Sequence, residues 1–309
     1  MPVVQPATAS HTTLEVMNLP RALRFYREVL GLQTHAASAT TGHLRATNGQ
    51  YAAMHERHNP GPQPFFNFYA RPVPDAAAVD AVHARIASAP DAWGIQEITI
   101  PAREDPTRFG VDTYGFYLKD GDGNWWRIEE NDSPFGTLLI PRDAEPRDSI
   151  VPAGPIGYVT LECRRLAPTV SFYRDYLGLE IRRVGPTYAH CGGYGGVNVI
   201  VVEVGDRLLP QRRSNHHGLM LRGDESTIDR LHAATAGVKD TFGIQKLQAP
   251  CAAHGSYSFY LEDQDTNWWE VEIWEEGICP WDRMEATLQA GGLGFARRPR
   301  PPQAAPLNR

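Results

Sequence analysis

An internal duplication is the feature that most constrains how this chain can fold. Residues 25–33 read FYREVLGLQ and residues 172–180 read FYRDYLGLE. Two further pairs follow in the same order, WGIQEI at 93–98 with FGIQKL at 242–247, and FYLKDGDGNWW at 116–126 with FYLEDQDTNWW at 259–269. Three ordered matches indicate that one half of the chain repeats the other. We therefore expect a first half at 1–132, a proline-rich linker at 133–155 and a second half at 156–278.

Each half divides again into two units with the order strand, helix and three strands. In the first unit His11–Met17 alternates as a strand does, and a helix with Pro20 in its first turn runs to a stop at Gly31. In the second unit 63–70 is expected to be a strand and 76–89 a helix. The four units span about 10–58, 62–132, 156–206 and 214–276. The sequence therefore predicts an α+β protein.

Composition excludes several classes of protein. The net charge is −6 and no basic block precedes the C-terminal tail, which argues against a nucleic-acid partner. No apolar run approaches the roughly 18 residues that span a bilayer, and the N-terminus lacks a signal pattern. The four cysteines are far apart with no CxxC, as in a reduced cytoplasmic protein. Residues 279–309 form an extension whose Pro- and Arg-rich end is expected to be disordered.

The most informative stretch is Ser256–Trp274, which reads as two strands joined by an acidic turn. Period-two geometry puts Glu270 and Glu272 on one face of the second strand. A carboxylate in the middle of a strand is costly to bury unless it is paired or bound to a metal. Glu270 therefore either faces water or points into a site.

Taken together, these landmarks resemble the vicinal oxygen chelate superfamily, the group of glyoxalase I, bleomycin-resistance proteins and type I extradiol dioxygenases. The resemblance rests on four βαβββ modules, on the FYRxxLGL motif that closes the first helix of each half, and on the DxDxN turn before the last strand. It covers about residues 10–275. It implies two domains of cupped, mixed β-sheets with the helices outside.

The resemblance also implies where metal ligands would lie. They are a His at the start of a module and a Glu three residues after the turn Asn. His11 opens module one, His217 opens module four, and Glu270 follows Asn267 by three. The first half has Arg127 at the glutamate position, and module three opens with Tyr158. The implied ligand set is therefore His11, His217 and Glu270, a two-His-one-carboxylate triad of the kind that binds non-haem Fe(II).

This triad requires modules one and four to share a domain, as in the hydroquinone-cleaving branch of the superfamily, while the alternative pairs modules three and four. The residues implied to move protons are Tyr260, His254 and His216. Tyr260 and Thr13 are implied to bind substrate. Near Tyr51, His55 or Glu56 could act as acid or base, and Glu56 or Tyr158 could be a further ligand. Glu272 matches Glu129 in the first half, which indicates a duplicated structural role.

The function that these residues imply is that of a cytoplasmic Fe(II)- or Mn(II)-dependent, extradiol-type dioxygenase. It would cleave a catechol- or hydroquinone-type ring with O₂, both held at the metal. One alternative is a redox-neutral, glyoxalase-like isomerase or lyase. The other is a metal-free small-molecule binding protein of the resistance type. Substrate identity and oligomeric state, including a homo-oligomer, stay open.

Overall fold

The computed structural model describes residues 2–61, 63–132, 135, 149–192, 198–253 and 255–274, and every structural statement below concerns these residues. Two nine-stranded sheets form the chain, and both mix parallel and antiparallel pairs. Helices pack against both sheets. The predicted α+β class and the cupped mixed sheets are confirmed.

The first half of the chain contains modules one and two. Module one consists of β1 (Thr8–Val16), α1 (Leu19–Glu28), β2 (Gln33–Ala36), β3 (Thr41–Arg45) and β4 (Tyr51–Glu56). Module two consists of β5 (Tyr69–Val73), α2 (Ala76–Ala87), the 3₁₀ turn η1 (Pro90–Trp93), β6 (Glu97–Ile98), β7 (Ala102–Arg103), α3 (Pro106–Phe109), β8 (Tyr114–Lys119) and β9 (Trp125–Glu130). The expected strand at 63–70 starts only at Tyr69, and the aromatic residues before it pack into a buried aromatic cluster.

The second half contains modules three and four. Module three consists of β10 (Val159–Cys163), α4 (Leu166–Ser171), the π-helical turn η2 (Phe172–Tyr176), β11 (Glu180–Val184), β12 (Tyr188–Gly192), β13 (Val199–Glu203) and the 3₁₀ turn η3 (Gly205–Arg207). Module four consists of β14 (His216–Met220), α5 (Glu225–Val238), β15 (Lys246–Leu247), β16 (Cys251–Ala253), β17 (Ser256–Glu262) and β18 (Trp268–Trp274).

Local signals explain where the helices start. Asn18 caps α1 by accepting a hydrogen bond from the Arg21 amide, and Pro20 lies in the first turn as predicted. Asp224 and Thr227 form a capping box at the start of α5. After α1 the chain passes Gly31 at φ +65°, a conformation that favours glycine, and enters β2.

Each sheet is assembled from one module of either half. One sheet runs β15-β17-β18-β14-β1-β4-β3-β2 and joins modules four and one; we call it the 1/4 sheet. The other runs β11-β12-β13-β10-β5-β9-β8-β6 and joins modules three and two; we call it the 2/3 sheet. Short strands β16 and β7 complete them. The pairing of module one with module four, which the ligand positions required, is the pairing that the chain adopts.

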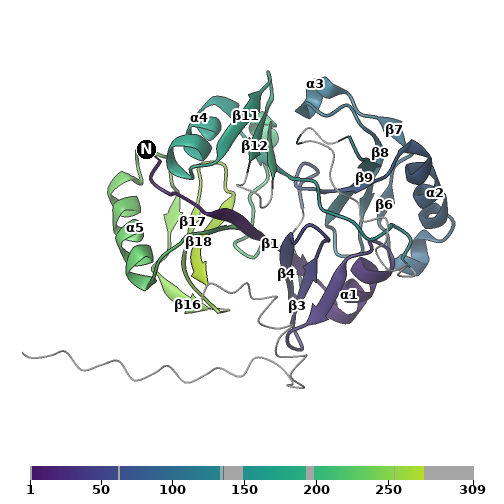
Figure 1. Cartoon of the computed structure of the whole chain (residues 1–309), viewed down its shortest axis with the longest axis horizontal. Helices are drawn as coiled ribbons and strands as arrows, with labels where there is room; N and C mark the ends of the chain where they lie inside the picture. The colour runs from purple at the N-terminus through teal and green to yellow at the C-terminus, as the bar shows by residue number, and fades with distance from the viewer. Residues whose placement is uncertain are drawn as a thin grey trace, which may run out of the picture.

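The helices cover the outer faces of the sheets. In Figure 1, α4 and α5 lie along one side of the molecule, α1 and α2 along the other, and β1 runs between them. α1 packs on β2, β3 and β4, and α5 on β17 and β18. One apolar core joins these helices to the sheets, while smaller buried clusters line the inner faces. The buried side chains that do not belong to the main core therefore lie on the inner faces of the two sheets.

The DxDxN turns that identified the repeat connect the two sheets. The Asp120 carboxylate accepts hydrogen bonds from the backbone amides of its own turn, and the Asn124 side chain donates to the Glu15 carbonyl at 3.2 Å. Asp263 and Asn267 do the same in the second half, where Asn267 donates to the Glu162 carbonyl at 3.0 Å. Each turn thus ties the end of one sheet to the first strand of a module in the other.

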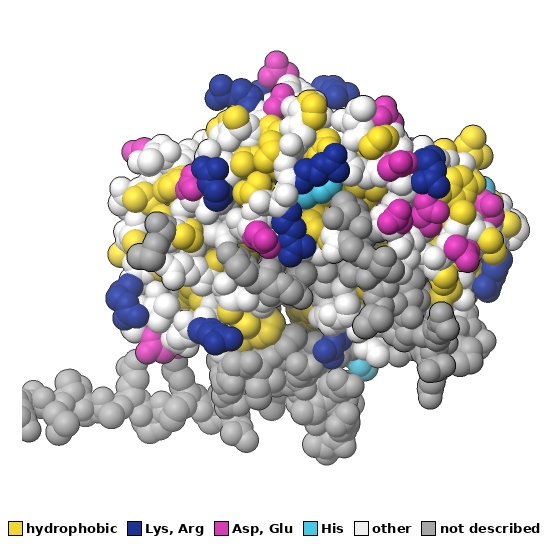
Figure 2. Space-filling model, turned by 45° about the horizontal axis from the view of Figure 1, so that its top comes forward, with side chains coloured by type: hydrophobic (Ala, Val, Ile, Leu, Met, Phe, Trp, Pro, Cys, Tyr) yellow, Lys and Arg dark blue, Asp and Glu magenta, His cyan; other side chains and the backbone are white. Residues whose placement is uncertain are grey.

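Some expectations concern the surface and the chain ends. Figure 2 shows positive and negative side chains interspersed over one face of the molecule. Within the described ranges no helix is long and apolar enough to cross a membrane. Three cysteines there, Cys163, Cys191 and Cys251, are free thiols. The predicted disordered tail and His254 lie outside the described residues.

Candidate metal centre

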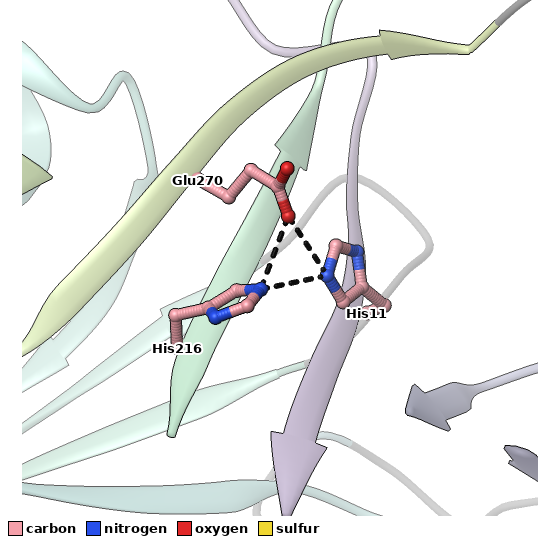
Figure 3. Close-up of side chains that lie close together, drawn as sticks. All are labelled: His11, His216 and Glu270. Atoms are coloured by element: carbon pink, nitrogen blue, oxygen red, sulfur yellow. Dashed lines mark hydrogen bonds and ion pairs between the residues drawn. The ribbon is translucent and has the colours of Figure 1, made fainter. Parts of the chain in front are cut away.

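Three side chains that lie far apart in the sequence converge on the inner face of the 1/4 sheet: His11, His216 and Glu270 (Figure 3). His11 Nε2 is 3.2 Å from His216 Nε2 and 3.2 Å from Glu270 Oε2. His216 Nε2 is 3.0 Å from Glu270 Oε2. The three atoms thus form a nearly equilateral triangle. All three residues are buried, with at most 7% of their surface exposed.

Strand order brings the three residues together. β14 lies between β1 and β18, and its parallel pairing puts Gly218 beside Glu270. His216 is two residues before Gly218 and so shares its face. A Cβ at Gly218 would lie 2.3 Å from His11 Nδ1 and 2.4 Å from His11 Cε1. The missing side chain therefore makes the space in which the His11 ring lies.

The ring of His11 is oriented from behind by a carboxylate. Its Nδ1 is 3.0 Å from Glu272 Oε1, the same oxygen that accepts a 2.6 Å hydrogen bond from the Ser10 hydroxyl. Because an ionised carboxylate only accepts, Nδ1 of His11 carries the proton in this contact. An irregularity of β1 between Ala9 and Thr12 lets the neighbouring Ser10 and His11 both reach Glu272.

The other two residues are held in the same manner. His216 Nδ1 is 2.7 Å from the Arg213 carbonyl, which can only accept, and the His216 amide donates to Thr13 Oγ1 at 2.7 Å. Glu270 Oε1 accepts a 2.6 Å hydrogen bond from Ser258. The atoms that bond to the supporting groups are Nδ1 of His11, Nδ1 of His216 and Oε1 of Glu270. The atoms left to face one another are Nε2, Nε2 and Oε2.

This arrangement concentrates unshared electron pairs. With both Nδ1 atoms protonated, a neutral His11 and a neutral His216 present lone pairs to each other and to an ionised oxygen of Glu270. Such a set needs a cation at its centre. Without a metal, a proton serves: burial opposes the charge on His11, but the Glu272 carboxylate and the bonds to Glu270 and Glu272 outweigh it and raise the pKa of His11 to about 10. Burial likewise opposes ionisation of Glu270, yet its bonds to His11 and His216 lower its pKa well below the usual value.

The donor set fits a divalent transition metal. Two ligands about 2.1 Å from one ion and at right angles to each other lie about 3.0 Å apart, which matches the edges of the triangle. Two imidazoles and one carboxylate suit Fe(II), Mn(II) or Zn(II), and a facial set of three leaves positions open for substrate and oxygen. The second ring nitrogen of each imidazole is already engaged, as in known metal sites.

His216, rather than the predicted His217, joins His11 and Glu270 in the cluster, and His217 lies outside it. Period-two geometry separates the adjacent side chains, so only His216 joins the cluster. His217 faces the 2/3 sheet, where it lines a small polar cavity with Asn67, Tyr69 and Thr160. Burial, followed by the charges of His216 and His11, lowers the pKa of His217 to about 3. The two adjacent histidines offered no sequence signal to decide which one points inward.

The residues expected to contact substrate have defined places. Tyr260 is the register partner of Glu270, and its ring centroid is 5.0 Å from that of His216. Burial and the Glu270 carboxylate raise the pKa of the Tyr260 hydroxyl, which keeps it a hydrogen-bond donor at neutral pH. Thr13 lies under His216 and supports it. Glu272 and Ser10, which sequence reasoning left out of the site, support His11.

Other candidates lie away from the cluster. Glu56 Oε2 accepts a 2.7 Å hydrogen bond from the Leu19 amide and so caps α1. His55 is opposite Thr41, towards the end of β4. Tyr158 belongs to the 2/3 sheet, where its hydroxyl donates to Glu129 Oε2 at 3.0 Å. Neither Glu56 nor Tyr158 is thus brought to the triad.

The inner face of the 2/3 sheet forms a matching cup, in which the described residues provide no metal triad. Aligning the two parallel strand pairs puts Arg127 at the position of Glu270 and Phe68 at that of His216. Tyr158 takes the position of His11, one residue before the matching first strand pair. Aromatic side chains fill this cup, including Phe68, Phe109, Tyr117, Trp125, Tyr158 and Tyr188.

Arg127 supplies the positive charge in this second cup. Its guanidinium is buried and donates to Glu104 Oε2 at 2.9 Å and to Glu129 Oε2 at 2.8 Å. The Nη2 group of Arg127 donates a hydrogen bond to the Thr113 carbonyl at 2.9 Å. A fixed side-chain cation thus lies between two carboxylates in one cup, whereas the other cup presents lone pairs to a cation from solution.

Comparisons with known proteins agree with this architecture. Residues 8–128 match the family model of the Glyoxalase/Bleomycin resistance protein/Dioxygenase superfamily. A candidate dioxygenase from Bacillus subtilis subsp. subtilis str. 168 is similar in structure with a TM-score of 0.56 and 14% identity, over 96% of this chain and 99% of that one. Glyoxalase I from Zea mays has a TM-score of 0.58 and 15% identity, over 91% of this chain and 95% of that one. A search of curated protein sequences finds no match.

At such identities the two solved structures show a shared fold and no more. The family model covers the first two modules, and the second half of the chain repeats their elements in the same order. Over residues 8–128 the chain therefore resembles the Glyoxalase/Bleomycin resistance protein/Dioxygenase superfamily.

Proposed function

We propose that the protein is a metal-dependent dioxygenase that cleaves a catechol- or hydroquinone-type ring, with Fe(II) or Mn(II) held by His11, His216 and Glu270. The observation that carries the proposal is the convergence of Nε2, Nε2 and Oε2 within 3.0–3.2 Å of one another. Three facial donors with neutral imidazoles and one carboxylate are the set used by non-haem Fe(II) oxygenases. The proposed partners are a small aromatic diol and O₂.

Such a metal, when bound, supplies Lewis acidity and one-electron chemistry with O₂ to a chelated diol. The chain's own residues provide the rest. Glu272 and the Arg213 carbonyl fix the tautomers of His11 and His216, so that both present Nε2 inward. Tyr260 stands beside Glu270 and would donate a hydrogen bond to a ring oxygen. The buried surroundings strengthen each of these interactions.

Metal analysis of three variants tests the ligand set. The protein, expressed with added iron or manganese, should hold about one metal ion per chain. His11→Ala and His216→Ala should reduce metal content at least tenfold. His217→Ala is the matched control because it removes the adjacent imidazole, and it should keep the metal. Loss of metal in His217→Ala but not in His216→Ala would contradict the proposed triad.

The nature of the metal and the consumption of oxygen test the reaction. Fe or Mn with O₂ uptake on addition of catechols or hydroquinones would support ring cleavage. Preference for Ni, Co or Zn, with no O₂ uptake, would indicate a redox-neutral, glyoxalase-like enzyme instead. If no sample held metal, even after anaerobic loading with Fe(II), the result would favour a small-molecule binding protein over an enzyme.

A further inference from the structure

A tyrosine and a histidine next to the triad form a buried pair that the metal site does not use. The Tyr51 hydroxyl is hydrogen-bonded to Nδ1 of His43, and the two rings are stacked with centroids 5.2 Å apart. Tyr51 is 5% exposed and His43 is 7% exposed. Two polar side chains buried against each other are costly unless they bond or act.

The pair lies on the inner face of the 1/4 sheet. On β4, Ala52 and Met54 belong to the main core under the helices, whereas Tyr51 and Ala53 form a separate buried cluster. His43 is the register partner of Ala53 and so shares that inner face. The strand alternation therefore directs Tyr51 and His43 to the side where the triad lies.

The pair is also adjacent to the triad. Tyr51 is the register partner of His11 on the neighbouring parallel strand, and the two ring centroids are 6.0 Å apart. Tyr260 contacts the cluster from β17, on the other side of β18 and β14. A ligand at the triad would thus have Tyr260 on one flank and Tyr51 on the other.

We propose that Tyr51 and His43 form a proton relay for a hydroxyl group of the aromatic diol; this rests on the proposed function. The Tyr51 oxygen accepts the proton of the ring hydroxyl while its own proton passes to His43 Nδ1. The ring hydroxyl becomes an oxyanion, Tyr51 is again neutral, and His43 becomes an imidazolium, so charge and protons balance. The substrate class is an aromatic with two oxygens on the ring. Tyr51 would touch the substrate, and His43 acts through Tyr51.

Several titratable or charged side chains face His43. His35 is its register partner on β2, Arg45 follows two residues along β3, and His55 shares the inner face of β4. None of these three side chains is a carboxylate. A base that is neutral at rest and charged after proton transfer is what a relay needs.

The 2/3 sheet provides an internal comparison. His190 is the register partner of Ile200 as His43 is of Ala53, and both occupy the same place in their modules. His190 Nε2 instead bonds to the Phe109 carbonyl at 2.9 Å, and Asn198 stands where Tyr51 would be. The histidine at this position thus contacts a backbone carbonyl in the 2/3 sheet and a tyrosine side chain in the 1/4 sheet.

The test uses the full chain and three variants: His43→Gln, Tyr51→Phe and the matched control His190→Gln. Glutamine keeps a hydrogen-bonding group at position 43 but cannot take a proton at neutral pH. Metal content is measured first and should be unchanged in all three. The metal-loaded proteins are then titrated anaerobically with 4-nitrocatechol, whose absorbance reports its ionisation, between pH 5 and 9. Oxygen uptake with the unsubstituted substrate class gives the second readout.

The relay predicts that His43→Gln and Tyr51→Phe raise the pH at which the bound probe loses its last proton by at least one unit. It predicts a fall in oxygen uptake of about 10²-fold, as expected for loss of a general base. His190→Gln should match the parent protein in both readouts. Unchanged probe ionisation in His43→Gln, with metal retained, would overturn the relay while leaving the proposed function standing. A parent protein that binds neither metal nor probe would overturn both.

Discussion

Arg127 occupies in the 2/3 sheet the register position that Glu270 occupies in the 1/4 sheet. Each residue follows a Trp-Trp pair and lies on the second strand of a duplicated hairpin. The exchange reverses the charge at this position. One cup therefore needs a cation from outside, while the other contains its own. The two halves of the duplication thus differ: one cup holds a candidate metal site and the other holds a buried ion-pair network.

Metal stoichiometry should reflect this division. We expect one ion per chain rather than two, because the guanidinium of Arg127 fills the charge requirement between Glu104 and Glu129. Arg127→Met should leave two buried carboxylates without a cation and lower the free energy of unfolding by about 4 kcal/mol. Chemical denaturation and elemental analysis measure the two effects. Two ions per chain, or an Arg127→Met variant as stable as the parent, would contradict this division.

Glu272 should control metal affinity through His11. In Glu272→Gln the amide no longer fixes the Nδ1 proton of His11 as a carboxylate does, and we expect metal affinity to fall about 10–100-fold. Glu129→Gln is the matched control, because Glu129 contacts Tyr158 in the filled cup at the same register position. It should alter stability through Arg127 but leave metal affinity unchanged. Equal metal affinities for Glu272→Gln and the parent would show that His11 is oriented without this carboxylate.

Metal binding should become tighter as pH rises. The pKa of His11 is about 10 in the metal-free protein, so a metal must displace its proton at any lower pH. Between pH 6.5 and 9 the apparent dissociation constant should fall about tenfold per unit, with about one proton released per ion. Competition against a chelator of known pH dependence provides the measurement. A dissociation constant that does not change over this range would mean that His11 is already neutral.

The same proton links stability to pH in the metal-free protein. Since the folded-state pKa of His11 is raised above the ordinary value of 6.5, its contribution to stability is fully present below pH 6.5 and is lost as pH rises through about 10. We expect the melting temperature of the metal-free protein to fall between pH 7 and 10. Saturating metal should remove much of this dependence, because the metal takes the place of the proton. An increase in melting temperature over this range without metal would contradict the assignment.

Much of this architecture could be predicted because it depends on repeats and on period-two patterns. The four modules and the face shared by Glu270 and Glu272 follow from where motifs recur. The sequence leaves open whether module four pairs with module one or with module three, and the strand order decides for module one. The choice between His216 and His217 could not be predicted, because adjacent strand residues differ only in the register that pairs β14 with β1 and β18. The contact between Tyr51 and His43 depends on pairing across β3 and β4, which sequence spacing alone does not fix.

Gly218 should be required for the metal site but not for the fold. In Gly218→Ala the new methyl group would lie 2.3–2.4 Å from two atoms of the His11 ring, so the imidazole must move out of the triangle. We expect metal affinity to fall at least 100-fold, while overpacking costs about 1–3 kcal/mol of stability, less than global unfolding requires. The 2/3 sheet has an alanine, Ala70, at the position that matches Gly218. There the Tyr158 hydroxyl takes the place of the metal-facing imidazole of His11. Ala70→Gly is therefore the matched control: it should lower stability modestly and leave metal content unchanged. A Gly218→Ala variant that folds and still binds one ion per chain would show that the His11 ring can reach the metal from another position.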